Sequence, residues 1–209
     1  MSTGKKGALI ATNAVMTICW LNVLFVLLKA FSEDKIQDDN FCTSDVKPAL
    51  DLAITASFIE ALNAVFGITK AKPAAVMMFV IVRAGVEFLA APLLPCACWQ
   101  HMFTAVFWAF GETFRFGCFT TDALVDGLDT AKSVRYTVGP IAFLCGASGE
   151  WTMVLKLAFE DEPTRSFLAK AFLWFCAATW PLGFSILFKQ LLSQRKKHFK
   201  ALKEKVKST

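Results

Sequence analysis

Six long apolar segments constrain this chain more than any other feature. They lie at residues 7–31, 50–69, 73–94, 99–119, 134–159 and 166–188. A helix of about 20 apolar residues is long enough to cross the hydrocarbon core of a bilayer, and each segment meets that length. Links as short as KAK at 70–72 leave no room for a second domain. The pattern predicts an all-α, six-transmembrane-helix bundle that forms a single domain over residues 1–209.

Charge predicts how this bundle is oriented. Lys5, Lys6 and the KAK link fall on one side, together with a basic tail at about 189–209, and the acidic stretch 32–45 falls on the other. Because Lys and Arg gather on the cytosolic side of membrane proteins, both termini are predicted to be cytosolic. The aromatic residues lie mostly in the apolar segments, so nucleic acid is not an expected partner.

Histidine and cysteine content limits metal and cofactor chemistry. His101 and His198 are the only histidines, so neither a His-rich metal site nor a triad that needs histidine is expected. Most of the seven cysteines lie in apolar runs, where cysteine usually acts as a small hydrophobic residue. The Cys96-x-Cys98 pair leaves a redox or metal role open, but no metal and no cofactor is predicted.

Charged side chains within the apolar segments are candidate functional residues, because a charge at membrane depth is costly. They are Glu60, Arg83, Glu87, Glu112, Arg115, Arg135 and Glu150. They either pair to hold the bundle together or line a site. Without a Gly-rich phosphate loop, a histidine pair or a serine elbow, the remaining chemistry is carboxylate acid/base work assisted by arginine. An apolar pocket of that kind suits an acyl chain on a thioester.

Five motifs follow one another through the apolar segments. They are TNAVMTICW at 12–20, IEALNAVFG at 59–67, FVIVR at 79–83, WAFGETFRF at 108–116 and VRYTVGPIAFLCGASGE at 134–150. In order and spacing they resemble the very-long-chain 3-hydroxyacyl-CoA dehydratases, also called protein-tyrosine-phosphatase-like membrane proteins. The similarity runs from about residue 8 to 190. No phosphatase nucleophile loop is present, so the resemblance implies a dehydratase of fatty-acid elongation, a lyase of lipid metabolism.

The resemblance also implies roles for particular residues. The family's catalytic pair is a tyrosine and a glutamate seven residues apart, and the glutamate corresponds to Glu150. Phe143 stands at the tyrosine position, so half of the pair is absent. The residues that match positions supporting the site are Glu60, Arg83, Glu112, Arg115, Arg135 and Gly146.

Other departures reduce the polarity expected around the site. Thr12, Asn63, Phe79 and Phe116 stand where the family has Tyr, His, Gln and Tyr. No nearby group replaces the missing hydroxyl. Cys145 lies about 200° around a helix from Phe143, and Tyr136 lies about 21 Å along the helix axis from Glu150. Loss of one positioned acid/base group costs roughly 10²–10⁴-fold in rate.

Two hypotheses stay open at this point. The first is an elongation-type dehydratase of the endoplasmic reticulum with weakened or lost catalysis, a pseudoenzyme that takes a lipid or acyl-CoA in its pocket. Lysines three and five from the end of KVKST form a dilysine-like retrieval pattern that fits this membrane. The second is a non-catalytic accessory or scaffold subunit that packs against other membrane-protein subunits. Such a subunit would belong to an energy-transducing complex in the mitochondrial inner membrane or in another organellar membrane.

Overall fold

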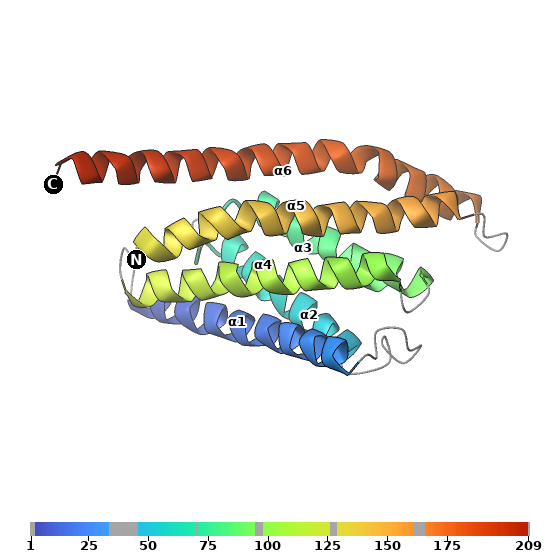
Figure 1. The fold of residues 1–209 in the computed structure, drawn as a ribbon, viewed down its shortest axis with the longest axis horizontal. Helices are drawn as coiled ribbons and strands as arrows, with labels where there is room; N and C mark the ends of the chain where they lie inside the picture. Colours follow the sequence, from blue (N-terminus) through green and yellow to red (C-terminus); the bar gives the residue numbers. More distant parts are fainter. Residues whose placement is uncertain are drawn as a thin grey trace.

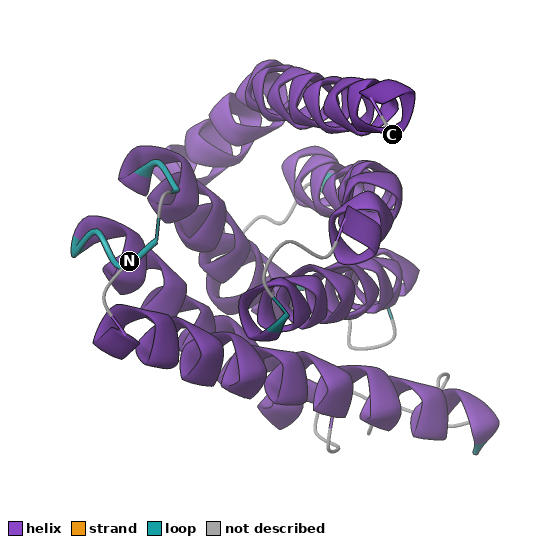
Figure 2. Ribbon diagram, turned by 90° about the vertical axis from the view of Figure 1, so that its left-hand side faces the viewer, coloured by secondary structure: helices purple, strands orange, loops and turns teal. Residues whose placement is uncertain are grey.

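The described part of the chain is entirely helical. A computed structural model describes residues 3–33, 46–69, 71–94, 98–125, 129–160 and 166–208, and no strand occurs among them (Figures 1 and 2). Its α-helices are α1 (Thr3–Ser32), α2 (Val46–Val65), α3 (Pro73–Gly85), α4 (Trp99–Leu124), α5 (Asp129–Phe159) and α6 (Phe167–Ser208). The predicted all-α class is therefore confirmed, with one α-helix in each predicted segment.

The helices run alternately up and down the bundle, but their order in space differs from their order in the chain. The main packed pairs are α3 with α2, α2 with α1, α1 with α4, α4 with α5, and α5 with α6. The bundle is thus an open ring whose two ends are α3 and α6. The start of α1 and the end of α6 lie at the same end of the molecule (Figure 1). This is the arrangement required for both termini to share a side; which side is cytosolic stays a prediction.

Five of the described helical segments are long and apolar enough to cross a membrane: Gly4–Ser32, Val46–Val65, Pro73–Leu93, Asp129–Phe159 and Phe167–Lys205. The chain is therefore treated as an integral membrane protein. Helix α4 is not among the five, because Gln100, His101, Glu112 and Arg115 interrupt its apolar sequence. It packs between α1 and α5, so its polar side chains face other helices and not lipid. The count of six spans stays a prediction.

The hydrophobic core lies between α1, α2, α4 and α5. Trp20 and Val23 of α1, Leu50 of α2 and Met153 of α5 are all fully buried. Small residues let α4 and α5 approach closely. A Cβ on Gly111 would lie 2.8 Å from the Cβ of Ala142, a separation that real side chains do not reach. This close packing places the two helices that carry most of the charged residues side by side.

Prolines within the spans remove backbone N–H donors, and two of them have visible consequences. Near Pro92 the α3 helix passes into a π-turn, η2 (Val86–Ala90), and a 3₁₀ turn, η3 (Ala91–Leu93). Pro181 of α6 leaves the carbonyl of Ala177 without its helical donor. The indole Nε1 of Trp151, on α5, donates to that oxygen at 3.0 Å. A side chain thus satisfies the freed carbonyl, as a membrane interior requires.

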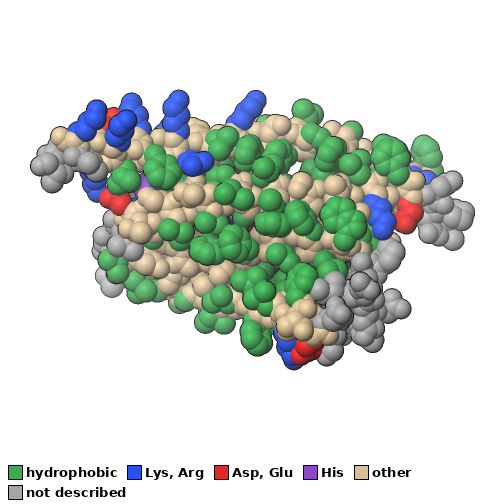
Figure 3. All heavy atoms as spheres, viewed as in Figure 1, with side chains coloured by type: hydrophobic (Ala, Val, Ile, Leu, Met, Phe, Trp, Pro, Cys, Tyr) green, Lys and Arg blue, Asp and Glu red, His purple; other side chains and the backbone are tan. Residues whose placement is uncertain are grey.

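Helix α6 continues without a break from the membrane segment into the basic tail. Lysine and arginine side chains gather along its C-terminal half, whereas apolar side chains cover the flank of the bundle (Figure 3). His198 anchors this half to α5, since its ring packs on Tyr136 with centroids 5.0 Å apart and its Nε2 lies 3.0 Å from the Ser133 hydroxyl. The sequence predicted that this tail is basic but did not predict that it is helical.

Candidate functional site

A cavity of about 1550 Å³ lies inside the open ring, with lining residues from all six α-helices. It runs from the end of the bundle where α1, α3 and α5 begin toward the middle of α5 and α6. On α5 its lining extends from Arg135 to Glu150, which is about 22 Å of helix. The cavity is therefore long enough to suit an extended chain.

The structure brings all eight residues that the family resemblance assigned to the catalytic pair or its support to this one cavity. Glu60 comes from α2, Arg83 from α3, Glu112 and Arg115 from α4, and Arg135, Phe143, Gly146 and Glu150 from α5. Residues from four helices, more than 80 positions apart in the chain, thus line one cavity. Their convergence is a fact of the fold; the catalytic and supporting roles assigned to them stay predictions.

A charged network links three helices along one side of the cavity. Arg115 of α4 holds Glu60 of α2 with both guanidinium Nη atoms, at 2.5 and 2.7 Å. The same arginine donates from Nε to Glu112 at 2.9 Å, and Arg83 of α3 donates to the other oxygen of Glu112 at 3.2 Å. Two arginines and two carboxylates therefore neutralise each other in a buried place, where an unpaired charge would be costly.

Glu150 lies apart from that network and has a different environment. Its side chain is buried, and the indole Nε1 of Trp108, on α4, donates to its Oε1 at 2.5 Å. The guanidinium of Arg83 lies over the Trp108 ring, 5.0 Å from the centroid. Within the described chain no cation forms an ion pair with Glu150. Among the described carboxylates of the cavity, Glu150 is the one held by an indole, whereas Glu60, Glu112 and Asp122 are paired with cations.

Gly146 makes the approach of Trp108 possible. A Cβ at this position would lie 3.2 Å from Cδ1 and 3.6 Å from Nε1 of that indole, which is tighter than ordinary side-chain contacts. Gly146 is one turn before Glu150 on the same face of α5. The absence of a side chain at Gly146 therefore leaves room for the Trp108 indole to reach the Glu150 carboxylate.

Phe143 lies in a stack of phenylalanines that also lines the cavity and reaches Arg83, whose guanidinium lies 4.5 Å from the Phe79 ring centroid. Its ring is nearly parallel to those of Phe184 and Phe188 of α6, at interplanar angles of 6° and 10° and centroid distances of 5.4 and 6.3 Å. Phe79 of α3 continues the stack, 6.2 Å from Phe143. The stack bridges α3, α5 and α6 across the opening of the ring. Sequence reasoning missed Phe184 and Phe188, although their spacing of four puts both on one helical face.

Glu87, one of the charged residues within the spans, does not belong to the cavity. It is fully buried in η2, where it contacts His101 of α4 at 2.8 Å and Lys47 of α2 at 3.6 Å. The cluster joins three elements near the other end of the bundle, as a structural ion pair does. Cys98 is buried and has a free thiol, and its CxC partner Cys96 lies outside the described residues.

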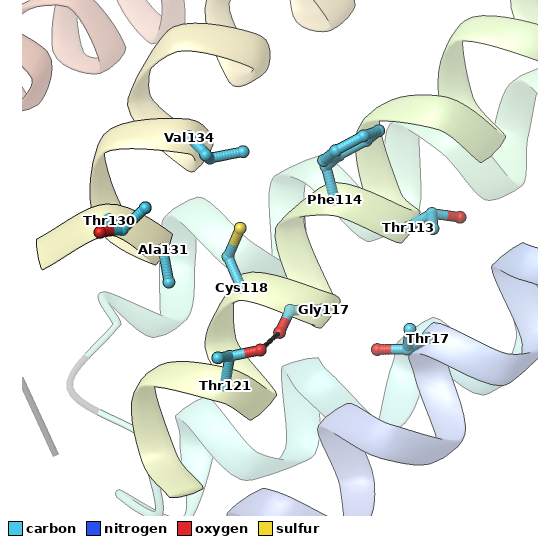
Figure 4. A pocket seen from close by; sticks show the side chains of 9 residues that line it. All are labelled: Thr17, Thr113, Phe114, Gly117, Cys118, Thr121, Thr130, Ala131 and Val134. Carbon is cyan, nitrogen blue, oxygen red and sulfur yellow. Dashed lines mark hydrogen bonds between the residues drawn. The ribbon is translucent and has the colours of Figure 1, made fainter. Parts of the chain in front are cut away.

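A second, smaller hollow lies between α1, α4 and α5 (Figure 4). Its volume is about 390 Å³, and the lining residues are Thr17, Thr113, Phe114, Gly117, Cys118, Thr121, Thr130, Ala131 and Val134. The Thr121 hydroxyl donates to the Gly117 carbonyl of its own helix at 2.9 Å. No charged side chain lines this hollow, so the candidate chemistry belongs to the large cavity.

The fold and the cavity together define a class: a helical membrane protein with charged residues set in an apolar pocket inside the bundle. A family model described as "Protein tyrosine phosphatase-like protein, PTPLA" matches residues 54–201. The chain therefore belongs to this family, that of the very-long-chain 3-hydroxyacyl-CoA dehydratases. No curated protein and no solved structure matches the chain.

Proposed function

We propose that this protein keeps the acyl-binding cavity of a 3-hydroxyacyl-CoA dehydratase and has weakened or lost its dehydration chemistry. One observation carries the proposal. The side chain two helical turns before Glu150, where the family pattern has tyrosine, is Phe143, and its ring packs against other phenyl rings. The family's second proton-transfer group is therefore absent from the cavity wall, while the carboxylate remains.

Dehydration of a 3-hydroxyacyl thioester breaks two bonds. A base removes a proton from C2, the hydroxyl leaves C3 with a proton from an acid, and a C2–C3 double bond forms. Glu150 can supply one of these transfers. A phenyl ring can supply neither, and loss of one positioned group is expected to cost roughly 10²–10⁴-fold in rate.

The other hydroxyls of the cavity do not replace a tyrosine. Thr12 and Thr179 donate to carbonyls of their own helices, at 3.0 and 2.8 Å. Tyr136 lies about 21 Å from Glu150 along the α5 axis. The carboxylates Glu60 and Glu112 are bound to Arg115. Glu150 is thus left without a second acid/base partner.

The experiment is a dehydratase assay of the purified chain with 3-hydroxyacyl-CoA of several chain lengths. We expect little turnover by the native protein and an increase of about 10²-fold or more in Phe143→Tyr, which restores the phenol. The increase should vanish in Phe143→Tyr combined with Glu150→Gln. Phe188→Tyr is the matched control, because it adds a phenol to the same stack from α6 and should not raise turnover.

Two results would count against the proposal. Native turnover that disappears in Glu150→Gln would mean that catalysis survives without the tyrosine. Failure of the native chain to bind any acyl ligand would contradict the proposal that the cavity binds acyl chains. The accessory-subunit hypothesis stays a prediction, since the exposed apolar side chains of α6 fit lipid as well as a protein partner. Retention of the same membrane proteins through purification would favour it.

A further inference from the structure

The three arginines of the cavity are not equivalent. Arg83 and Arg115 both contact carboxylates, so their charges are compensated. Arg135, near the start of α5, has no carboxylate within 4.0 Å among the described residues. Its guanidinium instead lies over the rings of Phe119 and Tyr136, at 4.6 and 4.5 Å from their centroids. A cavity-lining arginine with no carboxylate partner in the described part of the chain is suited to an anion from outside the protein.

The aromatic contacts hold this arginine without neutralising it. Phe119 comes from α4, and Tyr136 is itself packed on His198 of α6. The column of His198, Tyr136, Arg135 and Phe119 therefore spans three helices. Because the guanidinium is placed in advance, its planar set of donors loses little freedom on binding and can meet two oxygens of one phosphate together.

Other groups at the same end of the cavity favour a phosphate. Lys72 lines it at the start of α3, where the positive end of the helix dipole adds to the potential. Lys6, Gln190 and Gln194 line it as well. The acidic residue of this region, Asp122, is bound by Lys132 at 3.1 Å. Several donors and more than one positive charge thus surround the place that Arg135 occupies.

Beyond Arg135 the charges of one side of the cavity are paired with each other, and the other lining is largely apolar. The apolar lining there includes Phe79, Phe143 and Leu187, and the cavity continues toward Glu150. A ligand that satisfies both parts has an anionic head at Arg135 and an acyl chain extending along α5. We propose that Arg135 and Lys72 form a phosphate-binding subsite at the mouth of the cavity, and that the protein binds a phosphate-bearing amphiphile there. This inference rests on the acyl cavity of the proposed function.

The test is equilibrium binding of radiolabelled amphiphiles with one oleoyl chain to the full chain in a neutral maltoside detergent. The probes are lysophosphatidate, oleate and monooleoylglycerol, which differ in the head group. We expect lysophosphatidate to bind at least tenfold more tightly than the other two. Oleoyl-CoA, as a fourth probe, separates the two sources of phosphate: tighter binding than lysophosphatidate identifies a CoA thioester, and weaker binding a phospholipid.

Substitutions then locate the head group. Arg135→Gln should weaken the binding of lysophosphatidate at least tenfold, and Lys72→Gln should weaken it about threefold. The affinity for monooleoylglycerol should change less than twofold in both variants. Arg195→Gln is the matched control, because Arg195 is exposed on the tail of α6 and does not line the cavity. Lys72 is exposed and can be replaced without disturbing packing, so it tests the subsite if Arg135→Gln does not fold.

The outcomes separate the subsite from the acyl cavity. Equal affinities for the three head groups, or no effect of either substitution, would overturn the subsite and leave the acyl cavity intact. Oleate binding as tightly as lysophosphatidate would overturn phosphate as the ligand class. Binding of no probe would overturn both the subsite and the acyl cavity.

Discussion

The two walls of the cavity differ in chemistry. The wall built by α2, α3 and α4 is charged, and its carboxylates and arginines are joined by the hydrogen bonds of Glu60, Arg83, Glu112 and Arg115. The wall built by α5 and α6 carries an aromatic stack of Phe143 on Phe184 and Phe188, beside Glu150 and Arg135. Under the proposed function, the network that holds the helices together is retained, and the position that should carry the catalytic hydroxyl has a phenyl ring.

This contrast shows how a fold survives the loss of a reaction. Removing one member of a buried charge network leaves the others unpaired, which is costly. Replacing tyrosine by phenylalanine keeps the ring and its packing and removes only an oxygen. The first change would disturb the bundle, and the second changes chemistry alone. The following predictions test that difference, from the largest expected effect to the smallest.

The largest effect should come from the centre of the charged wall. Glu112→Ala leaves Arg83 and Arg115 short of a counter-charge in a buried place, and we expect a loss of about 3–5 kcal/mol in the free energy of unfolding. SDS-induced unfolding in mixed micelles measures it. Glu204→Ala is the control: Glu204 pairs with Lys200 at 3.9 Å on the exposed tail, and its loss should cost less than about 0.5 kcal/mol. Similar losses in the two variants would contradict a structural role for the network.

A smaller effect is expected where the two walls meet. Gly146→Ala places a Cβ 3.2 Å from Trp108, so the indole must move away from Glu150. We expect a loss of about 1–3 kcal/mol from overpacking, measured by the same unfolding assay and by tryptophan fluorescence. Gly139→Ala, on the same helix, has nothing within 4 Å of the new Cβ. It should stabilise the helix by about 0.5–1 kcal/mol. If Gly139→Ala also destabilised the protein, the loss in Gly146→Ala would reflect a general sensitivity of α5 and not the contact with Trp108.

The aromatic wall should give the smallest effect. In a double-mutant cycle, Phe143→Leu and Phe184→Leu should show a coupling of about 0.5–1.5 kcal/mol, the usual value of an aromatic pair beyond its buried area. Phe143→Leu combined with Phe110→Leu is the control, because Phe110 packs on Phe114 and not on this stack. That pair should be additive within about 0.5 kcal/mol. Zero coupling between Phe143 and Phe184 would mean that the stack does not hold α5 and α6 together.

Sequence reasoning predicted the site better than it predicted the walls. It found Glu60, Glu112 and Glu150 because a charge in an apolar span is rare and conspicuous. It found no role for Phe184 or Phe188, because a phenylalanine in an apolar span looks like any lipid-facing residue. It also left Glu87 undecided. The structure assigns that residue to a cluster with His101 and Lys47, away from the cavity.

The sequence by itself determined the helices, since apolar length and turn residues depend only on neighbours in the chain. It also determined the family and the absence of a tyrosine at residue 143. The tertiary structure alone decided the ring order α3–α2–α1–α4–α5–α6, the pairing of Arg115 with Glu60, and the contacts of Arg135, which has aromatic and no carboxylate partners among the described residues. The physical reason is that the local sequence around an arginine is the same whether or not a carboxylate about 50 positions away packs against it. Only the packing of helices decides which charges are compensated and which can bind a ligand.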